Sequence, residues 1–140
     1  MMFKKNSRFL IVEDSSVVRE IIRQALEQMD YKPADEAENG KLGWEKILLS
    51  VEENKPYDLV FSDINMPEID GLKLLEMVRG NPSTSQMPIV VVTTESEKQI
   101  VLKAVMSGVS GYMVKPFGVE NVKTKMQEVY ARLNSSDTTG

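Results

Sequence analysis

The chain has 140 residues, enough for one domain with a single core, and its 17 basic and 21 acidic side chains give a formal net charge of −4. This mild acidity argues against nucleic acid as a direct partner, and no apolar run approaches the roughly 20 residues that span a bilayer or resembles a signal peptide, so we expect a cytoplasmic protein without membrane insertion. The chain has no cysteine and no histidine, which excludes disulfides, thiol nucleophiles, Ser-His-Asp triads and zinc sites built on those residues.

Five short apolar runs alternate with five segments whose apolar residues recur at helical spacing. In chain order we predict strand 9–14, helix 15–29, strand 32–38, helix 41–54, strand 57–63, helix 71–80, strand 87–94, helix 96–108, strand 110–117 and helix 119–133. The run 32–38 carries the weakest strand pattern, whereas the β-branched run 87–94 carries the strongest.

Polar residues and glycines mark the ends of several predicted helices. Ser15 or Ser16 can cap the first helix by accepting a hydrogen bond from its first turn, and Asn39 with the glycine after it predicts a turn before the second. Asp70 is expected to be structural, starting the third helix as a turn or cap. Gly80 ends that helix.

The βα order, repeated five times, predicts the fold class. Continuous apolar strands alternating with helices indicate an α/β protein with a doubly wound, parallel five-stranded sheet of the flavodoxin-like (βα)5 type. We expect one domain over residues 1–134, followed by a polar and disordered tail over residues 135–140.

Chemically active side chains end four of the predicted strands: Glu13, Asp14, Asp63, Thr93 and Lys115. In a parallel sheet these groups converge at one edge. Crowded carboxylates repel one another, and a hard divalent cation, Mg²⁺ or Mn²⁺, relieves that repulsion. A cation, a lysine and a hydroxyl around a carboxylate suit phosphoryl transfer, with Asp63 as the nucleophile that forms an aspartyl phosphate.

Each of these residues also has an ordinary explanation when taken alone. An acid at a strand end is usually a helix cap, threonines are common in β-branched strands, and Lys-Pro-Phe after a strand is usually a loop. These explanations do not account for acids, hydroxyl and lysine meeting at the same edge.

The segments "LIVEDS", "AENG", "LVFSDINMPEIDGL", "MPIVVVTT" and "GYMVKPF" occur in this order between about Arg8 and Leu133. In this respect the chain resembles the receiver domains of two-component response regulators, most closely stand-alone chemotaxis receivers of the CheY type. The resemblance implies that Asp63 is the phosphoacceptor. It also implies that Glu13, Asp14, Asp63 and the backbone carbonyl of Asn65 hold Mg²⁺. The pair Glu13-Asp14 departs from the Asp-Asp that chemotaxis receivers often carry, so Glu13 would reach the metal through water.

The resemblance assigns further roles near the ends of the last two strands. Lys115 would contact the phosphoryl oxygens, and its bond to Pro116 would be cis. Thr93 would move toward the phosphoryl group, and Tyr112 would be the aromatic switch that turns inward after it. Thr94 stands where the family often has a small residue, and its bulk could crowd Tyr112.

The implied function is a phosphorylation switch. A sensor histidine kinase would donate the phosphoryl group, and the modified chain would bind a downstream protein through the face formed by segments 96–108, 110–117 and 119–133. Within the first of these, Ile100 or Val101 is expected to be exposed. The chain would be no enzyme in the usual sense, although it would catalyse its own phosphoryl transfer and slow autodephosphorylation.

Several alternatives stay open from the sequence. The downstream role could be control of a flagellar motor in chemotaxis, a phosphorelay shuttle, or that of a receiver cut from a larger regulator. A magnesium-dependent phosphatase of the haloacid dehalogenase type is disfavoured because Asn65 replaces its general acid. A binding module that is never phosphorylated is a further reading.

Overall fold

A computed structural model describes residues 2–66, 69–94 and 98–135, and within these ranges five strands form one parallel sheet. The strands are β1 (Phe9–Val12), β2 (Asp35–Ala37), β3 (Leu59–Asp63), β4 (Ile89–Thr93) and β5 (Gly111–Val114). Their order in space is β2-β1-β3-β4-β5. The chain therefore reverses direction across the sheet at β1, and the carboxyl ends of β1 and β3 flank the crevice where ligands of such sheets bind.

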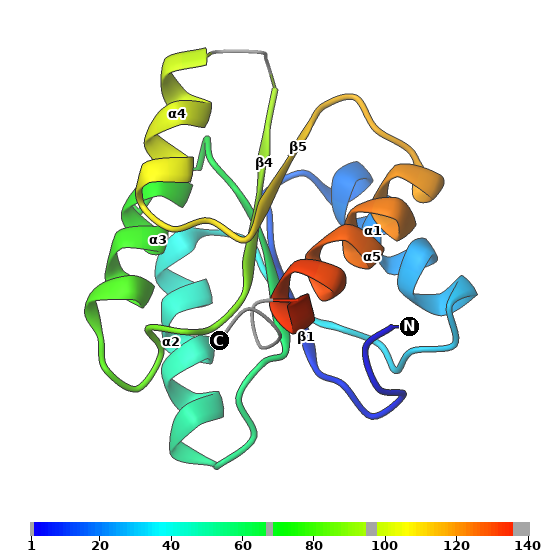
Figure 1. Cartoon of the computed structure of the whole chain (residues 1–140), viewed down its shortest axis with the longest axis horizontal. Helices are drawn as coiled ribbons and strands as arrows, with labels where there is room; N and C mark the ends of the chain where they lie inside the picture. Colours follow the sequence, from blue (N-terminus) through cyan, green and yellow to red (C-terminus); the bar gives the residue numbers. More distant parts are fainter. Residues whose placement is uncertain (1, 67–68, 95–97, 136–140) are drawn as a thin grey trace.

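Helices cover both faces of the sheet (Figure 1). They are α1 (Ser16–Gln28), α2 (Gly40–Glu52), α3 (Gly71–Gly80), α4 (Lys98–Met106) and α5 (Val119–Ser135). In Figure 1, α1 and α5 lie on one side of the sheet and α2, α3 and α4 on the other. The predicted doubly wound (βα)5 fold is confirmed.

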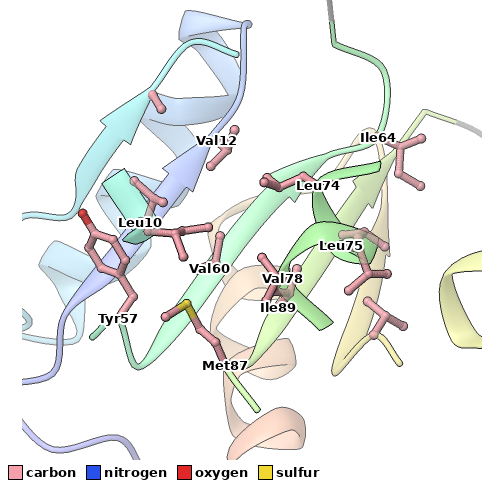
Figure 2. Close-up of a cluster of buried hydrophobic side chains, with 14 of the residues drawn as sticks. Leu10, Val12, Tyr57, Val60, Ile64, Leu74, Leu75, Val78, Met87 and Ile89 are labelled. Carbon is pink, nitrogen blue, oxygen red and sulfur yellow. The ribbon is translucent and has the colours of Figure 1, made fainter. Parts of the chain in front are cut away.

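Alternate residues of the central strands supply two buried clusters, one under each layer of helices. Leu10, Val60 and Ile89 point toward the α2–α4 side, where Leu74 and Leu75 of α3 pack on them (Figure 2). The opposite cluster joins the other strand residues to α1 and α5, through Phe9, Ile11, Leu59, Phe61, Val90, Ile22, Leu26, Val122 and Met126. Because the central strands are apolar on both faces, their ends are the places where polar side chains can gather.

The predicted elements are right in type, and their bounds differ at a few points. The second strand was predicted over 32–38 and extends only over Asp35–Ala37. Asn39 does not form a separate turn but caps α2, because its side chain accepts a hydrogen bond from the Leu42 N–H at 2.9 Å, and Gly40 is already helical. The tail was predicted to begin at residue 135, but Ser135 is the last residue of the C-terminal helix. Residues 67–68 and 95–97, and residues 136–140 of the predicted tail, lie outside the described residues.

The prediction for the exposed apolar residues of α4 is wrong. Ile100 and Val101 are both half-buried, and Ile100 packs against the core. Leu102, Val105 and Met106 are exposed instead. Ala104 is fully buried and belongs to the same core cluster as Val60 and Ile89, so its side of α4 faces inward.

Within the described ranges, no helix combines the length and the apolarity needed to cross a membrane. The helix starts follow the predicted caps: Ser15 accepts a hydrogen bond from the Val18 N–H at 3.3 Å, and Asp70 accepts one from the Lys73 N–H at 2.8 Å. Asp70 is therefore a structural acid, as predicted.

Replacing Asp70 with alanine should lower the free energy of unfolding by about 1 kcal/mol, because α3 loses its N-cap acceptor. Asp70→Asn, which keeps a capping oxygen, should stay close to the wild type. Urea unfolding followed by circular dichroism measures both variants. Equal losses in the two variants would show that the charge of Asp70, and not its capping bond, matters.

Candidate functional site

Three acidic side chains meet at the carboxyl edge of the sheet. Glu13 and Asp14 follow β1, Asp63 ends β3, and one carboxylate oxygen of each lies within 4.8 Å of the others. Glu13 and Asp63 are buried, at 1% and 2% exposure, while Asp14 is exposed. The cluster thus has a buried floor and one acid facing solvent.

Lys115, just beyond β5, supplies the positive charge of this edge. Its Nζ lies 3.2 Å from Glu13 Oε1, 3.4 Å from Glu13 Oε2 and 3.5 Å from Asp63 Oδ1. The Lys115–Pro116 peptide is cis, as the resemblance implies. One ammonium group among three carboxylates leaves the cluster with an excess of negative charge.

Glu13 carries the largest electrostatic cost. Burial raises its pKa to about 7, and the neighbouring charge of Asp63 adds to this, while the hydrogen bond from the Ser15 N–H at 3.0 Å and the charge of Lys115 act in the opposite direction. Glu13 Oε1 is buried and accepts no hydrogen bond from the residues that the structure describes; it meets Lys115 as an ion pair only. A buried carboxylate oxygen with spare acceptor capacity suits a cation.

Asp63 is held by its own loop. Its Oδ1 accepts a hydrogen bond from the Asn65 N–H at 3.4 Å. Burial raises the pKa of Asp63, and Lys115 and the Asn65 N–H partly offset that rise. Lys115 therefore favours the ionised form of the Asp63 carboxylate, against the effect of burial.

This set of donors fits a hard divalent cation. Three carboxylates are close enough to share one ion, and two of them, Glu13 and Asp63, are buried. Within the described residues, Glu13 Oε1 accepts no hydrogen bond. Oxygen-only ligands of this kind select magnesium-like ions over softer metals. The predicted ligands Glu13, Asp14 and Asp63 are thus brought together; the role of the Asn65 carbonyl stays a prediction.

The two predicted switch residues lie in different positions relative to this cluster. Thr93 ends β4 beside β3, is 1% exposed, and its carbonyl accepts a hydrogen bond from the Lys115 N–H at 2.6 Å. Tyr112, on β5, points outward and is 40% exposed, with Lys125 Nζ 5.7 Å from the ring centre. Thr93 therefore lies at the carboxyl edge of the sheet, with the acids, whereas Tyr112 lies on the outer surface.

Gly71 is a site residue that sequence reasoning missed. A Cβ at this position would lie 2.2 Å from the carbonyl oxygen of Asp63 and 2.7 Å from Ile64 Cα. Only glycine lets α3 begin this close to the backbone of the central acid. The pair Asp70-Gly71 signals a helix start, but nothing in it signals this close approach.

In metal-free protein, the stability contributed by Glu13 should fall as the pH rises from 4.5, its ordinary pKa, to about 7. Across this window the folded state keeps the proton that the unfolded chain has lost, so unfolding becomes easier, by up to about 3 kcal/mol. Urea unfolding in EDTA at a series of pH values measures the effect. Glu13→Gln should remove this part of the pH dependence, and parallel curves for the two proteins would contradict it.

Comparisons with known proteins agree with this geometry. The response regulator receiver domain family matches residues 9–127. The chemotaxis protein CheY1 of Helicobacter pylori is 38% identical over 122 residues, which cover 87% of this chain and 95% of that protein. The chemotaxis protein CheY homolog of Campylobacter jejuni is 37% identical over 122 residues, covering 87% and 91%.

Solved structures show the same fold. The chemotaxis response regulator CheY4 of Vibrio cholerae superposes with a TM-score of 0.77 at 27% identity, covering 89% of this chain and 98% of that one. A putative response regulator from Chloroflexus aurantiacus gives a TM-score of 0.77 at 28% identity, covering 91% and 99%. The chain therefore belongs to the family of response regulator receiver domains, and it is similar to chemotaxis receivers of the CheY type.

Proposed function

We propose that this chain is a phosphorylation-controlled switch, which accepts a phosphoryl group on Asp63 from the phosphohistidine of a sensor histidine kinase and then binds a downstream protein. One observation carries the proposal: a buried carboxylate at the end of β3 lies 3.5 Å from Lys115 and shares its edge with two further acids. Members of this family are signalling proteins and not classical enzymes, and they bind a divalent metal at such an acidic cluster.

In the proposed transfer, the Asp63 carboxylate attacks phosphorus as the P–N bond of the phosphohistidine breaks. The electron pair of that bond stays on the imidazole, and the phosphoryl group moves to Asp63 as an acyl phosphate. The Lys115 ammonium neutralises charge on the phosphoryl oxygens, and the Asn65 N–H orients the attacking carboxylate. Positioning and charge are sufficient because the reaction demands little covalent chemistry from the protein.

The ion in this proposal is Mg²⁺, with Mn²⁺ as a substitute. Glu13, Asp14, Asp63 and the Asn65 carbonyl would hold it, since these are hard oxygen donors. When bound, it would neutralise charge on the carboxylates and on the transferring phosphoryl group. Hydrolysis of the acyl phosphate by water would then reset the switch.

The signal would leave the site through Thr93. Its hydroxyl would move toward the phosphoryl group and vacate space into which Tyr112 turns. Tyr112 starts outside, at the rim of a cavity of about 360 Å³ lined also by Val114, Phe117 and Lys125. A two-state change of this kind is biased by whichever state the phosphoryl group contacts better.

The proposed docking surface is the face formed by α4, β5 and α5. Five apolar side chains are exposed on α4 and β5: Leu102, Val105, Met106, Tyr112 and Val114. Exposed apolar side chains grouped on neighbouring elements are typical of a protein-binding surface. Because two relatives are named chemotaxis proteins, we assign the partner to chemotaxis, with the flagellar motor switch as the candidate target, and place the exchange in the cytoplasm, where kinases obtain ATP.

Asp63→Asn should abolish phosphorylation by acetyl phosphate in the presence of Mg²⁺, since the amide is not a nucleophile for phosphorus. Intact mass spectrometry with and without hydroxylamine, which cleaves acyl phosphates, measures the modification. Asp70→Asn is the matched control and should be modified like the wild type. A phosphorylated Asp63→Asn protein would refute the proposed acceptor.

Thr93→Val should separate phosphorylation from the switch. The variant keeps the shape of the side chain but loses the hydroxyl, so beryllofluoride with Mg²⁺ should still bind at Asp63 while Tyr112 stays exposed. NMR of the Tyr112 ring and of the α4 and β5 amides reads the change, and Thr93→Ser should respond like the wild type. If Thr93→Val moves Tyr112 fully, the proposed route through the hydroxyl is wrong.

A further inference from the structure

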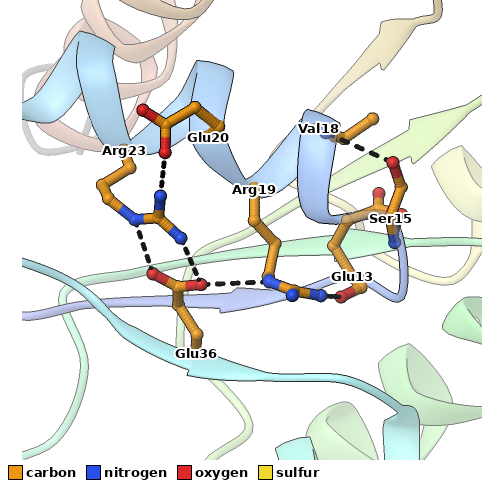
Figure 3. A network of polar contacts seen from close by, with 7 residues as sticks. All are labelled: Glu13, Ser15, Val18, Arg19, Glu20, Arg23 and Glu36. Carbon is orange, nitrogen blue, oxygen red and sulfur yellow. Dashed lines mark hydrogen bonds and ion pairs between the residues drawn. The ribbon is translucent and has the colours of Figure 1, made fainter.

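A chain of charged side chains connects α1 and β2 to the loop that carries Glu13 (Figure 3). Arg19, on α1, donates from Nη1 to the backbone carbonyl of Glu13 at 2.7 Å and from Nε to Glu36 Oε1 at 3.0 Å. Its side chain is only 15% exposed. The Arg19 guanidinium therefore links Glu36 of β2 to the backbone of Glu13, one of the three acids of the cluster.

Glu36 is itself fixed by a second arginine. Arg23 donates from Nε to Glu36 Oε2 and from Nη2 to Glu36 Oε1, both at 2.9 Å, and also pairs with Glu20. The Arg23 hydrogen bond is the main cause that lowers the pKa of Glu36, with burial acting against it. Glu36 thus stays ionised and holds Arg19 in a defined orientation by a charge-assisted bond.

Glu13 is hydrogen-bonded through its backbone N–H, its backbone carbonyl and one carboxylate oxygen. Its N–H donates to the Ala37 carbonyl at 2.9 Å, its carbonyl accepts from Arg19, and its Oε2 accepts from the Ser15 N–H at 3.0 Å. Ala37 directly follows Glu36 in β2, so two successive β2 residues hold Glu13, one directly and one through Arg19. The bonds from Ala37 and Arg19 act on the backbone of Glu13, and this backbone positions both Glu13 and Asp14.

We propose that Arg19, oriented by Glu36, is a positioning residue that preorganises the Glu13–Asp14 segment for a divalent cation; this inference rests on the proposed function. Without a cation, the carboxylates of Glu13, Asp14 and Asp63 repel one another and favour movement of the loop away from β3. Arg19 resists that movement. Once it is removed, cation binding must restore the geometry, so affinity falls while the fully loaded site stays intact.

The other end of the same strand pair provides a matched control. Arg8 also pairs with a β2 carboxylate, Asp35, at 3.1 Å, and also donates from Nη1 to a backbone carbonyl, that of Lys55. Asp35 and Glu36 are neighbours in sequence. Arg8 therefore makes the same kinds of bond between the strands, but at their amino ends, away from the acidic cluster.

The test compares Arg19→Gln and Arg19→Lys with Arg8→Gln in the full chain. Isothermal titration with Mg²⁺ alone gives the dissociation constant, and the initial rate of acetyl phosphate transfer against Mg²⁺ concentration gives the half-saturating concentration and the maximal rate. Arg19→Gln should raise the dissociation constant about tenfold, the low end for partners of metal ligands. Its maximal rate should stay within about twofold of the wild type, because the loaded geometry is kept.

Arg19→Lys keeps the charge but cannot bond to the Glu13 carbonyl and Glu36 with separate fixed nitrogens, so it should lie between Arg19→Gln and the wild type. Arg8→Gln should lose stability without a change in the dissociation constant. Glu36→Gln leaves Arg19 in place but holds it weakly, so it should also raise the Mg²⁺ dissociation constant. This variant replaces Arg19→Gln in the test if Arg19→Gln does not fold.

A wild-type dissociation constant in the folded Arg19 and Glu36 variants would overturn the inference, as would an equal rise in Arg8→Gln. A lower maximal rate at an unchanged half-saturating concentration would also overturn it, by placing Arg19 in the transfer step. If the wild-type protein is not phosphorylated at all, the proposed function fails instead, and the Mg²⁺ titration still decides the role of Arg19.

Discussion

Repulsion among three carboxylates at one edge of the sheet is the constraint on which this structure depends. Glu13, Asp14 and Asp63 bring oxygens within 4.8 Å of one another, two of them out of water, and Lys115 offsets only one of the three charges. The folded chain therefore carries an electrostatic cost: burial raises the pKa values of Glu13 and Asp63, and the neighbouring acids add to that rise. A site with this excess of negative charge is arranged to gain most from a cation, which is what a functional cluster requires and a merely structural one avoids.

The backbone around the cluster is what holds these charges in place. Ala37 bonds the Glu13 N–H, the Ser15 N–H bonds its carboxylate, and α3 approaches the carbonyl of Asp63 so closely that position 71 has no room for a Cβ. Hydrogen bonds and close packing of this kind are short-range and directional, whereas the repulsion that they oppose is not. The apolar layers on both faces of the sheet then fix the strands that carry these bonds.

Local patterns in the sequence predict the fold and the cluster, and tertiary contacts decide the rest. The strand ends could be read because a parallel sheet aligns its carboxyl ends whatever packs around it, so Glu13, Asp63 and Lys115 had to meet. The exposed side of α4 could not be predicted, because its sequence has apolar residues on more than one side. Which side is buried, that of Ala104, depends on how the helix packs in the fold. The bond from Arg19 to Glu36 joins residues 17 apart in sequence, and the close approach of Gly71 depends on a loop path, so neither leaves a periodic signal.

The same edge also gives the proposed switch a short route to the outer surface. The Lys115 N–H bonds the Thr93 carbonyl at 2.6 Å, so the two residues assigned to contact the phosphoryl group are joined through their backbones across β4 and β5. Tyr112 stands on β5 only three positions before Lys115, in an alternating strand whose odd residues are buried and whose even residues, Tyr112 and Val114, face outward. A displacement of Thr93 or Lys115 must therefore act on the strand that presents Tyr112. No long chain of side chains is needed, because the sheet edge is at once the proposed reaction site and the end of the strand that carries the proposed docking surface.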